Sequence, residues 1–189
     1  MPRISLLETA HRIVGAYLVG GSVAIDATLG NGHDLLFLAQ AVGERGRVFG
    51  FDIQQPAVVS SYRRLLRHDL QRRATLRLAS HADMHLKIPE VFRGQIKAVM
   101  FNLGYLPGAD KAIITQIHST LSALNAALSL LAPQAVITVL AYPGHQGGDS
   151  ETRALEDWCN RLDKSIFNVE TIFSSHPQAT APRLFVIRK

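Results

Sequence analysis

The sequence predicts a doubly wound α/β fold, in which a mostly parallel seven-stranded sheet carries helices on both faces. Short apolar runs bounded by turn residues alternate with longer segments of helical periodicity along the chain. The last two apolar runs have no helical segment between them, which indicates a C-terminal hairpin that adds one antiparallel strand. No repeat, low-complexity tract or linker interrupts this alternation, so we expect a single domain over residues 1–189.

Each element follows from local signals. In the first helix, Leu7, His11 and Val14 recur at helical spacing. Gly43 ends the second helix, and Pro133 lies just beyond the fourth. The predicted helices are Ser5–Leu18, Asp34–Val42, Gln55–Asp69, Thr115–Leu131 and Asp149–Leu162. The predicted strands are Val23–Ala27, Arg47–Phe51, Thr75–Ala79, Ile96–Phe101, Ala135–Ala141, Asn168–Phe173 and Leu184–Arg188.

The composition excludes several classes of protein. Hydrophobic residues make up 47% of the chain and charged residues 19%, which is enough apolar material for a folded core. Cys159 is the only cysteine, which excludes an intrachain disulfide, argues against a zinc site and fits a reducing compartment. The chain has neither the apolar run of about 18 residues that a membrane span needs nor a signal-peptide pattern. We therefore expect a cytoplasmic protein without a membrane span or a bound metal.

The loop after the first predicted strand is the first candidate site, because ligands of such sheets bind at the carboxyl ends of the strands. Gly30 and Gly32 allow a ligand to approach the backbone closely. Thr28 stands where a dinucleotide-binding G-x-G-x-x-G fingerprint has its first glycine. The carboxylate of Asp26 is unfavourable beside a pyrophosphate but favourable beside the cationic methionine part of S-adenosylmethionine. A glycine-bearing turn without a ligand is the alternative. The candidate cofactor residues in this loop are Asp26, Thr28, Gly30, Asn31, Gly32 and Asp34.

The next two strands also end in polar residues. Asp52 ends the second strand, where an acidic residue can bind both ribose hydroxyls of an adenosine-type ligand, and its alternative role is to cap the following helix. Gln54 is placed to contact the ribose or the adenine edge. Ser80 and His81 follow the third strand, where polar residues commonly meet the adenine ring; a solvated loop is the alternative.

The fourth and fifth strands supply the candidate catalytic residues. Asn102 emerges from a buried strand and is similar to the first residue of the (D/N)-P-P-Y motif, in which a side-chain and a backbone carbonyl hold a target amine; both prolines are absent here. Tyr105 follows in the same loop. After the fifth strand, Tyr142 is a candidate for stacking on a base and His145 for binding or polarising the target. An Asx turn at Asn102 and a solvated His145 are the alternatives.

An arginine-rich stretch follows the second strand of this chain, whose formal net charge is +5. The stretch contains Arg63, Arg64, Arg67, His68, Arg72, Arg73 and Arg77, with Asp69 as its single acid. Such a surface can bind RNA phosphates, and a solvated helix face is the alternative.

Four segments carry a family resemblance. They are Asp26–Asp34, Phe51–Gln54, Phe101–Gly108 with Asp110 and Lys111, and Tyr142–His145. In this order they resemble the putative rRNA methylase family, whose characterised members are the MnmM (YtqB-like) tRNA methyltransferases. The resemblance implies a class I S-adenosylmethionine-dependent methyltransferase with a Rossmann-like sheet. It also implies a homodimer that binds the anticodon stem-loop of tRNA and converts 5-aminomethyl-(2-thio)uridine at the wobble position to 5-methylaminomethyl-(2-thio)uridine.

Three other interpretations remain open from the sequence. They are an N-methyltransferase acting on rRNA or a small amine, a non-catalytic nucleotide-binding module, and an NAD dehydrogenase. Binding of S-adenosylmethionine separates the methyltransferases from the dehydrogenase, and methyl transfer to tRNA separates catalysis from binding.

Overall fold

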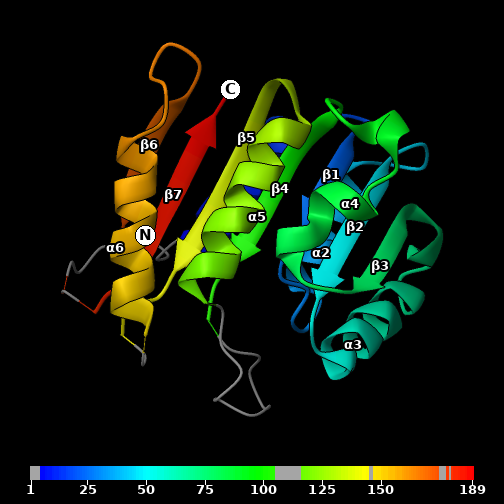
Figure 1. The fold of residues 1–189 in the computed structure, drawn as a ribbon. Helices are drawn as coiled ribbons and strands as arrows, with labels where there is room; N and C mark the ends of the chain where they lie inside the picture. Colours follow the sequence, from blue (N-terminus) through cyan, green and yellow to red (C-terminus); the bar gives the residue numbers. More distant parts are fainter. Residues whose placement is uncertain (1–4, 105–115, 145–146, 175–177, 179) are drawn as a thin grey trace, which may run out of the picture.

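A computed structural model describes residues 5–104, 116–144, 147–174, 178 and 180–189. Its centre is a seven-stranded sheet with the strand order β3-β2-β1-β4-β5-β7-β6 (Figure 1). The strands are β1 Val23–Asp26, β2 Arg47–Asp52, β3 Ala74–Leu78, β4 Ile96–Asn102, β5 Leu131–Ala141, β6 Asn168–Phe173 and β7 Arg183–Arg188. Neighbouring strands pair in parallel, except that β7 runs antiparallel to both β5 and β6. The predicted parallel sheet with a C-terminal antiparallel hairpin is therefore confirmed.

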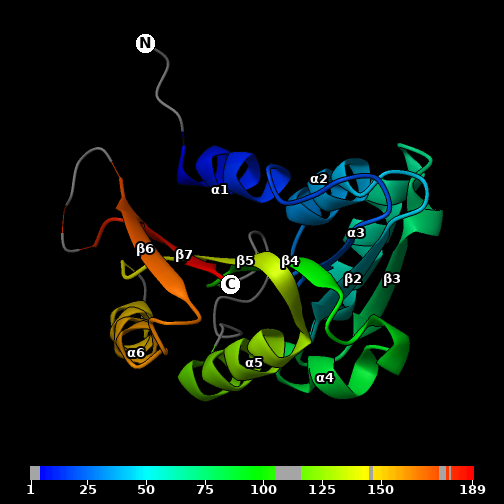
Figure 2. The ribbon, with the colours of Figure 1, turned by 90° about the horizontal axis from the view of Figure 1, so that it is seen from above.

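Helices cover both faces of the sheet, with α1, α2 and α3 on one face and α4, α5 and α6 on the other (Figure 2). They are α1 Leu6–Gly15, α2 His33–Ala41, α3 Gln55–Leu66, α4 Met84–Lys87, α5 Ile117–Leu130 and α6 Gly148–Asn160. Three short 3-10 helices, η1 Gln71–Arg73, η2 His81–Asp83 and η3 Glu90–Phe92, join these elements. In the described part of the chain, no helix has the length and apolar character to cross a bilayer.

Each face of the sheet has its own hydrophobic core, because successive strand residues point to opposite faces. In β1, Val23 and Ile25 pack in the core under α5 and α6, whereas Ala24 packs in the core under α1 and α2. Because the central strands are buried on both faces, their sequences are continuous apolar runs and do not alternate between apolar and polar residues.

Two helices end three residues earlier than the sequence predicts. α1 begins after Ser5, whose hydroxyl accepts from the backbone N–H of Glu8 while the Glu8 carboxylate accepts from the N–H of Ser5, and the helix ends at Gly15 rather than at Leu18. α3 ends at Leu66 because the chain turns through Asp69, which has a left-handed φ of 55°. The ends of both helices are set by turns, not by the apolar pattern that continues past them.

The junction between α5 and β5 also differs from the prediction. β5 begins at Leu131, directly after the last residue of α5, whereas the sequence predicts a strand from Ala135. The strand passes through Pro133 and then Gln134, which has a left-handed φ of 53°. Its pairing with β4 is irregular at this point, and so β5 accommodates a proline that ordinarily marks a break. Thr115, the predicted start of α5, lies outside the described residues.

Candidate active site

The candidate site lies at the edge of the sheet to which the parallel strands point, the lower edge in Figure 1. The turns that follow β1, β2, β4 and β5 meet at this edge because parallel neighbours end on the same side. Hydrogen bonds connect three of these turns directly. The arrangement therefore brings the predicted cofactor residues of β1 and β2 next to Asn102, at the end of β4.

The loop after β1 needs glycine at two positions. Gly32 has a left-handed φ of 76°, and a Cβ atom there would lie 2.8 Å from the Cα and Oγ atoms of Ser61 in α3. Gly30 is also left-handed, with a φ of 48°, and its N–H donates to Asp52 Oδ2 at 3.0 Å. The missing side chains thus let the loop pack against α3 while it turns into α2.

Asp26 is a fully buried carboxylate, and the described residues donate a hydrogen bond to only one of its two oxygens. Its Oδ1 accepts from the N–H of Thr28 at 3.1 Å, but its buried Oδ2 has no hydrogen-bond partner among them. Burial raises the pKa of Asp26 well above its usual range, the nearby Asp34 and Asp52 raise it further, and the backbone N–H groups of Thr28 and Leu35 oppose them. An unpartnered buried acceptor in a field of negative charge suits a cationic donor such as an ammonium group.

Asp52 joins the end of β2 to the glycine loop. Its Oδ1 accepts from the N–H of Gln54 at 2.9 Å, in addition to the bond between Oδ2 and Gly30. The alternative role of Asp52 as a helix cap is wrong, because the residue that precedes α3 is Gln54 and it makes no side-chain cap. Ile53, between these two residues, is an exposed apolar side chain that the sequence analysis missed. Each carboxylate oxygen of Asp52 keeps a free lone pair, which is the requirement for binding a ribose diol.

Two more residues of the loop have protein partners. The carboxylate of Asp34, at the start of α2, lies 2.6 Å from Nε2 of His11 in α1, and the His11 ring stacks on Phe37 with 4.1 Å between ring centroids. The backbone carbonyl of Asn31 accepts from Arg64 Nε at 2.7 Å. His11 is thus a site residue that the sequence analysis placed only on the packed face of the first helix. Its presence among apolar residues of that face was the available signal.

Ser80 and His81 support the turn after β3. Ser80 Oγ accepts from the N–H of Ala82 and so begins η2. His81 is buried, its ring lies edge-on to Phe101, and its Nδ1 is 3.1 Å from the carbonyl oxygen of Ala27. Burial lowers the pKa of His81, which favours a neutral ring whose Nδ1–H donates to that carbonyl. This bond attaches the turn to the loop after β1, and contact of either residue with adenine stays a prediction.

Asn102 and Tyr142 follow neighbouring strands. The N–H of Asn102 donates to Thr28 Oγ1 at 2.8 Å, which fixes the end of β4 against the glycine loop. Tyr142 follows β5 and is half-buried; burial and then the charge of Asp34 raise its pKa. The remaining two predicted catalytic residues, Tyr105 and His145, lie outside the described residues.

Carboxylates gather at this site. The carboxylates of Asp34 and Asp52 lie close enough to Asp26 to raise its pKa. Within the described ranges, no three His, Cys, Asp or Glu side chains are arranged to hold a metal ion. The carboxylates of Asp26 and Asp52 accept hydrogen bonds from backbone N–H groups, and Asn102 ends the fourth strand at the same edge of the sheet.

Solved structures share this architecture, and a plant methyltransferase is similar in sequence. The crystal structure of a putative rRNA methylase from Clostridium thermocellum matches with a TM-score of 0.92 and 36% identity, covering 100% of this chain and 98% of that one. A putative methyltransferase from Streptococcus mutans, solved in complex with SAH, matches with a TM-score of 0.86 and 31% identity, covering 100% and 99%. The Arabidopsis thaliana chloroplastic tRNA (mnm(5)s(2)U34)-methyltransferase is 37% identical over 166 residues. That match covers 84% of this chain, which spans 60% of the length of the plant protein.

Together, the sheet order, the carboxylates that end β1 and β2 and these structural matches define a methyltransferase of the class I, S-adenosylmethionine-dependent type. Within that class, the chain belongs to the putative rRNA methylase family, whose family model matches residues 48–188.

Proposed function

We propose that this chain, as one methyltransferase domain, methylates the amine of 5-aminomethyl-(2-thio)uridine at the wobble position of tRNA and forms 5-methylaminomethyl-(2-thio)uridine. The observation that carries the proposal is the position of Asn102, a neutral amide at the end of β4 that is tied to the glycine loop through Thr28. The plant relative, whose name specifies methylation at U34 of tRNA, supports this choice of substrate. A homodimer and the anticodon stem-loop as the bound part of tRNA belong to the same proposal.

S-adenosylmethionine, the cofactor of this class, supplies a methyl group bound to a positively charged sulfur. The buried Oδ2 of Asp26 is an acceptor without a partner in the described part of the chain, and we assign to it the cofactor's ammonium group. To Asp52 we assign the ribose hydroxyls, because both of its oxygens are held in place by backbone N–H groups. The other proposed cofactor residues are Thr28, Gly30, Asn31, Gly32, Asp34, Gln54, Ser80 and His81.

The target amine must lose a proton before it can be methylated. An amine with the pKa of lysine, about 10.4, is neutral in roughly one molecule in 2,500 at pH 7. Removing the proton from such an amine at this pH costs up to about 4.6 kcal/mol. The carbonyl of the Asn102 side chain can accept a hydrogen bond from the neutral amine without adding a charge that favours the ammonium form. Holding the amine near attack distance supplies a further part of the acceleration.

Tyr142 lines the proposed pocket beside Asn102. Because its pKa is raised, the hydroxyl stays protonated at neutral pH and can donate a hydrogen bond while the ring offers a face to the target base. Tyr105 and His145 complete the pocket in this proposal.

Methyl transfer to defined substrates tests the function. The purified chain is incubated with S-adenosylmethionine and, separately, with tRNA that carries the unmethylated 5-aminomethyl group, with rRNA, and with a small aliphatic amine. Nucleoside mass spectrometry should find 5-methylaminomethyl-(2-thio)uridine in tRNA, and the Asn102→Ala variant is the matched control. Incorporation into rRNA or the small amine alone would overturn the proposal and favour the alternative N-methyltransferase.

A further inference from the structure

One face of α3 carries more arginines than the one, Arg64, that contacts the candidate active site. A hollow of about 300 Å³ runs along this face and is lined by Pro56, Val59, Ser60, Arg63, Arg64 and Arg67. These positions recur three or four residues apart, so they form one stripe along the helix, which we call the α3 stripe. The stripe contains no carboxylate.

The arginines of the α3 stripe differ in whether their side chains have hydrogen-bond partners. Arg64 is anchored, since its Nε donates to the carbonyl of Asn31 at 2.7 Å and its Nη2 lies 3.1 Å from Nε2 of His33. Arg63 and Arg67 are exposed and, among the described residues, their side chains have neither an ion pair nor a hydrogen bond. Two unpaired guanidinium groups one helical turn apart are suited to bind two anionic groups at once.

The stripe lies next to the site. Figure 1 shows α3 at the lower edge of the sheet, beyond the end of β2. Arg64 bonds to the same loop that contains Gly30 and Gly32, so the stripe continues from the loop that we assign to the cofactor. A large ligand whose reacting group reaches Asn102 can therefore extend along α3.

The surroundings of the stripe favour a nucleic acid over a second copy of this chain. A two-fold contact through this face would bring the same surface of both copies together, and that surface has arginines without carboxylates to meet them. Tyr62, which precedes Arg63 in α3, is 47% exposed. Arginine with an exposed aromatic ring is the combination that binds phosphates and stacks on unpaired bases.

We infer that the α3 stripe binds the RNA backbone next to the target nucleotide, with Arg63 and Arg67 each contacting a phosphate and Arg64 joining this surface to the cofactor loop. This inference rests on the proposed RNA substrate. The inference also assigns only part of the arginine-rich stretch to the RNA surface. Arg73 is not part of the surface, because its Nη1 donates to the carbonyl of Ala39 near the end of α2.

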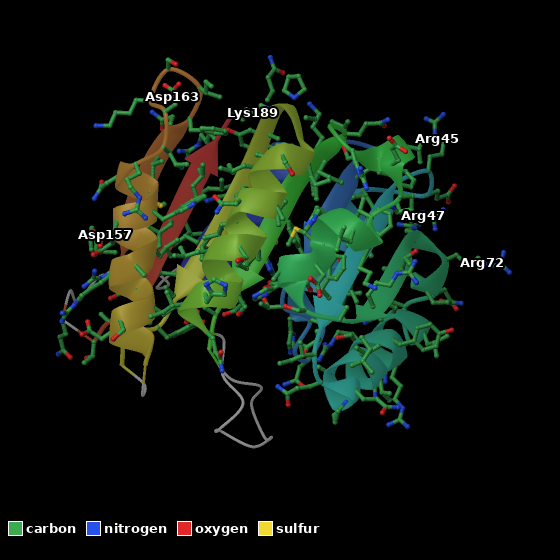
Figure 3. All side chains as sticks on the ribbon, viewed as in Figure 1. Arg45, Arg47, Arg72, Asp157, Asp163 and Lys189 are labelled. Atoms are coloured by element: carbon green, nitrogen blue, oxygen red, sulfur yellow. The ribbon has the colours of Figure 1, made fainter. Side chains whose placement is uncertain are left out.

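The test compares two double variants that remove equal charge. Arg63→Gln with Arg67→Gln changes the stripe, whereas Arg45→Gln with Arg161→Gln changes exposed arginines elsewhere. Arg45 lies at the upper edge of the sheet in Figure 3, opposite to α3. Arg161 follows α6, near the labelled Asp163, which is also at the upper edge. Binding of fluorescein-labelled unfractionated tRNA is measured by anisotropy at several salt concentrations.

The stripe variant should bind tRNA at least about tenfold more weakly, and the slope of log affinity against log salt should fall by about 1.4–1.8, as expected for two lost phosphate contacts. Its KM for tRNA should rise while kcat at saturating tRNA and the affinity for S-adenosylmethionine stay unchanged. The upper-edge variant should behave like the wild type.

Equal tRNA affinity and salt slope in the two variants would overturn the inference. A change from dimer to monomer in sedimentation that is confined to the stripe variant would also overturn it, since the stripe would then be a contact between copies. Failure of the proposed function looks different: the wild type would bind tRNA through the stripe and yet methylate no 5-aminomethyl group.

Discussion

Replacing Asp26 with asparagine should have opposite effects on stability and on cofactor binding. The substitution keeps an oxygen to accept from the Thr28 N–H, and it replaces the unpartnered Oδ2 with an amide NH₂ group. In the protein without cofactor, this removes a buried charge that Asp34 and Asp52 repel. The free energy of unfolding near pH 8 should therefore rise by at least about 1 kcal/mol, the lower end of the cost of leaving a buried polar group unsatisfied.

The pH dependence follows from the raised pKa of Asp26. A carboxyl group whose pKa is higher in the folded state stabilises the fold below its unfolded pKa, and that contribution is lost as the pH rises through the folded value. The wild type without cofactor should lose this contribution progressively as the pH rises above about 3.9, the usual pKa of an aspartate. Asp26→Asn should not, so the difference between the two proteins grows as the pH rises. Urea unfolding at a series of pH values measures it.

The same substitution should lower the affinity for the cofactor, in contrast to its stabilising effect on the fold. Loss of a charge-assisted hydrogen bond to the ammonium group costs about 1.5–3 kcal/mol, which is a fall of about 10- to 150-fold in affinity by calorimetry. Asp163→Asn is the control, because this exposed carboxyl lies far from the site and its hydrogen bonds with Ser165 lower its pKa. An Asp26→Asn protein that binds S-adenosylmethionine as tightly as the wild type and is no more stable at pH 8 would refute the reasoning.

Four further outcomes are expected. Asp52→Ala should weaken S-adenosylmethionine binding about 5- to 150-fold in calorimetry, and an unchanged Kd would remove Asp52 from the ribose site. Asn102→Ala should slow single turnover on amine-bearing tRNA at least about a hundredfold, while its affinity for the cofactor stays within a few fold of the wild type. The turnover rate of Asn102→Asp should also be low and should recover partly as the pH rises. Near-normal rates would exclude Asn102 from the mechanism. Gly32→Ala should lower the free energy of unfolding by about 2 kcal/mol in urea, because the left-handed backbone and Ser61 oppose a Cβ; an unchanged midpoint contradicts this. Cys159, whose pKa burial and Glu156 raise to about 12, should react with iodoacetamide at pH 8 only after denaturation, and rapid labelling of the folded protein would contradict its burial.

The sequence predicts the positions of the strands well because they are buried on both faces and stand out as apolar runs. It also predicts which residues meet at the site edge, since each polar residue that ends a parallel strand is delivered to the same side of the sheet. Asp26, Asp52 and Asn102 were found in this way, from strand ends alone. The carboxyl-end rule is a property of topology, and it needs no knowledge of side-chain packing.

Contacts that depend on how helices pack could not be predicted. The pair between His11 and Asp34 joins α1 to α2, and neither helix shows in sequence which of its faces meets the other. The same limit applies to the arginine stretch, which reads as one surface. The turn after α3 separates Arg73 from Arg63 and Arg67, and only the folded chain shows that separation.

The bond between Thr28 and Asn102 uses the main chain of Asn102 and not its side chain. Every residue except proline carries the same N–H group, so a change of amino acid at this position leaves the bond in place. The two ends of the site are thus held together independently of the chemistry offered to the substrate. Under the proposed function, evolution can therefore change the target preference at position 102 in a single step without breaking the bond to Thr28 in the glycine loop.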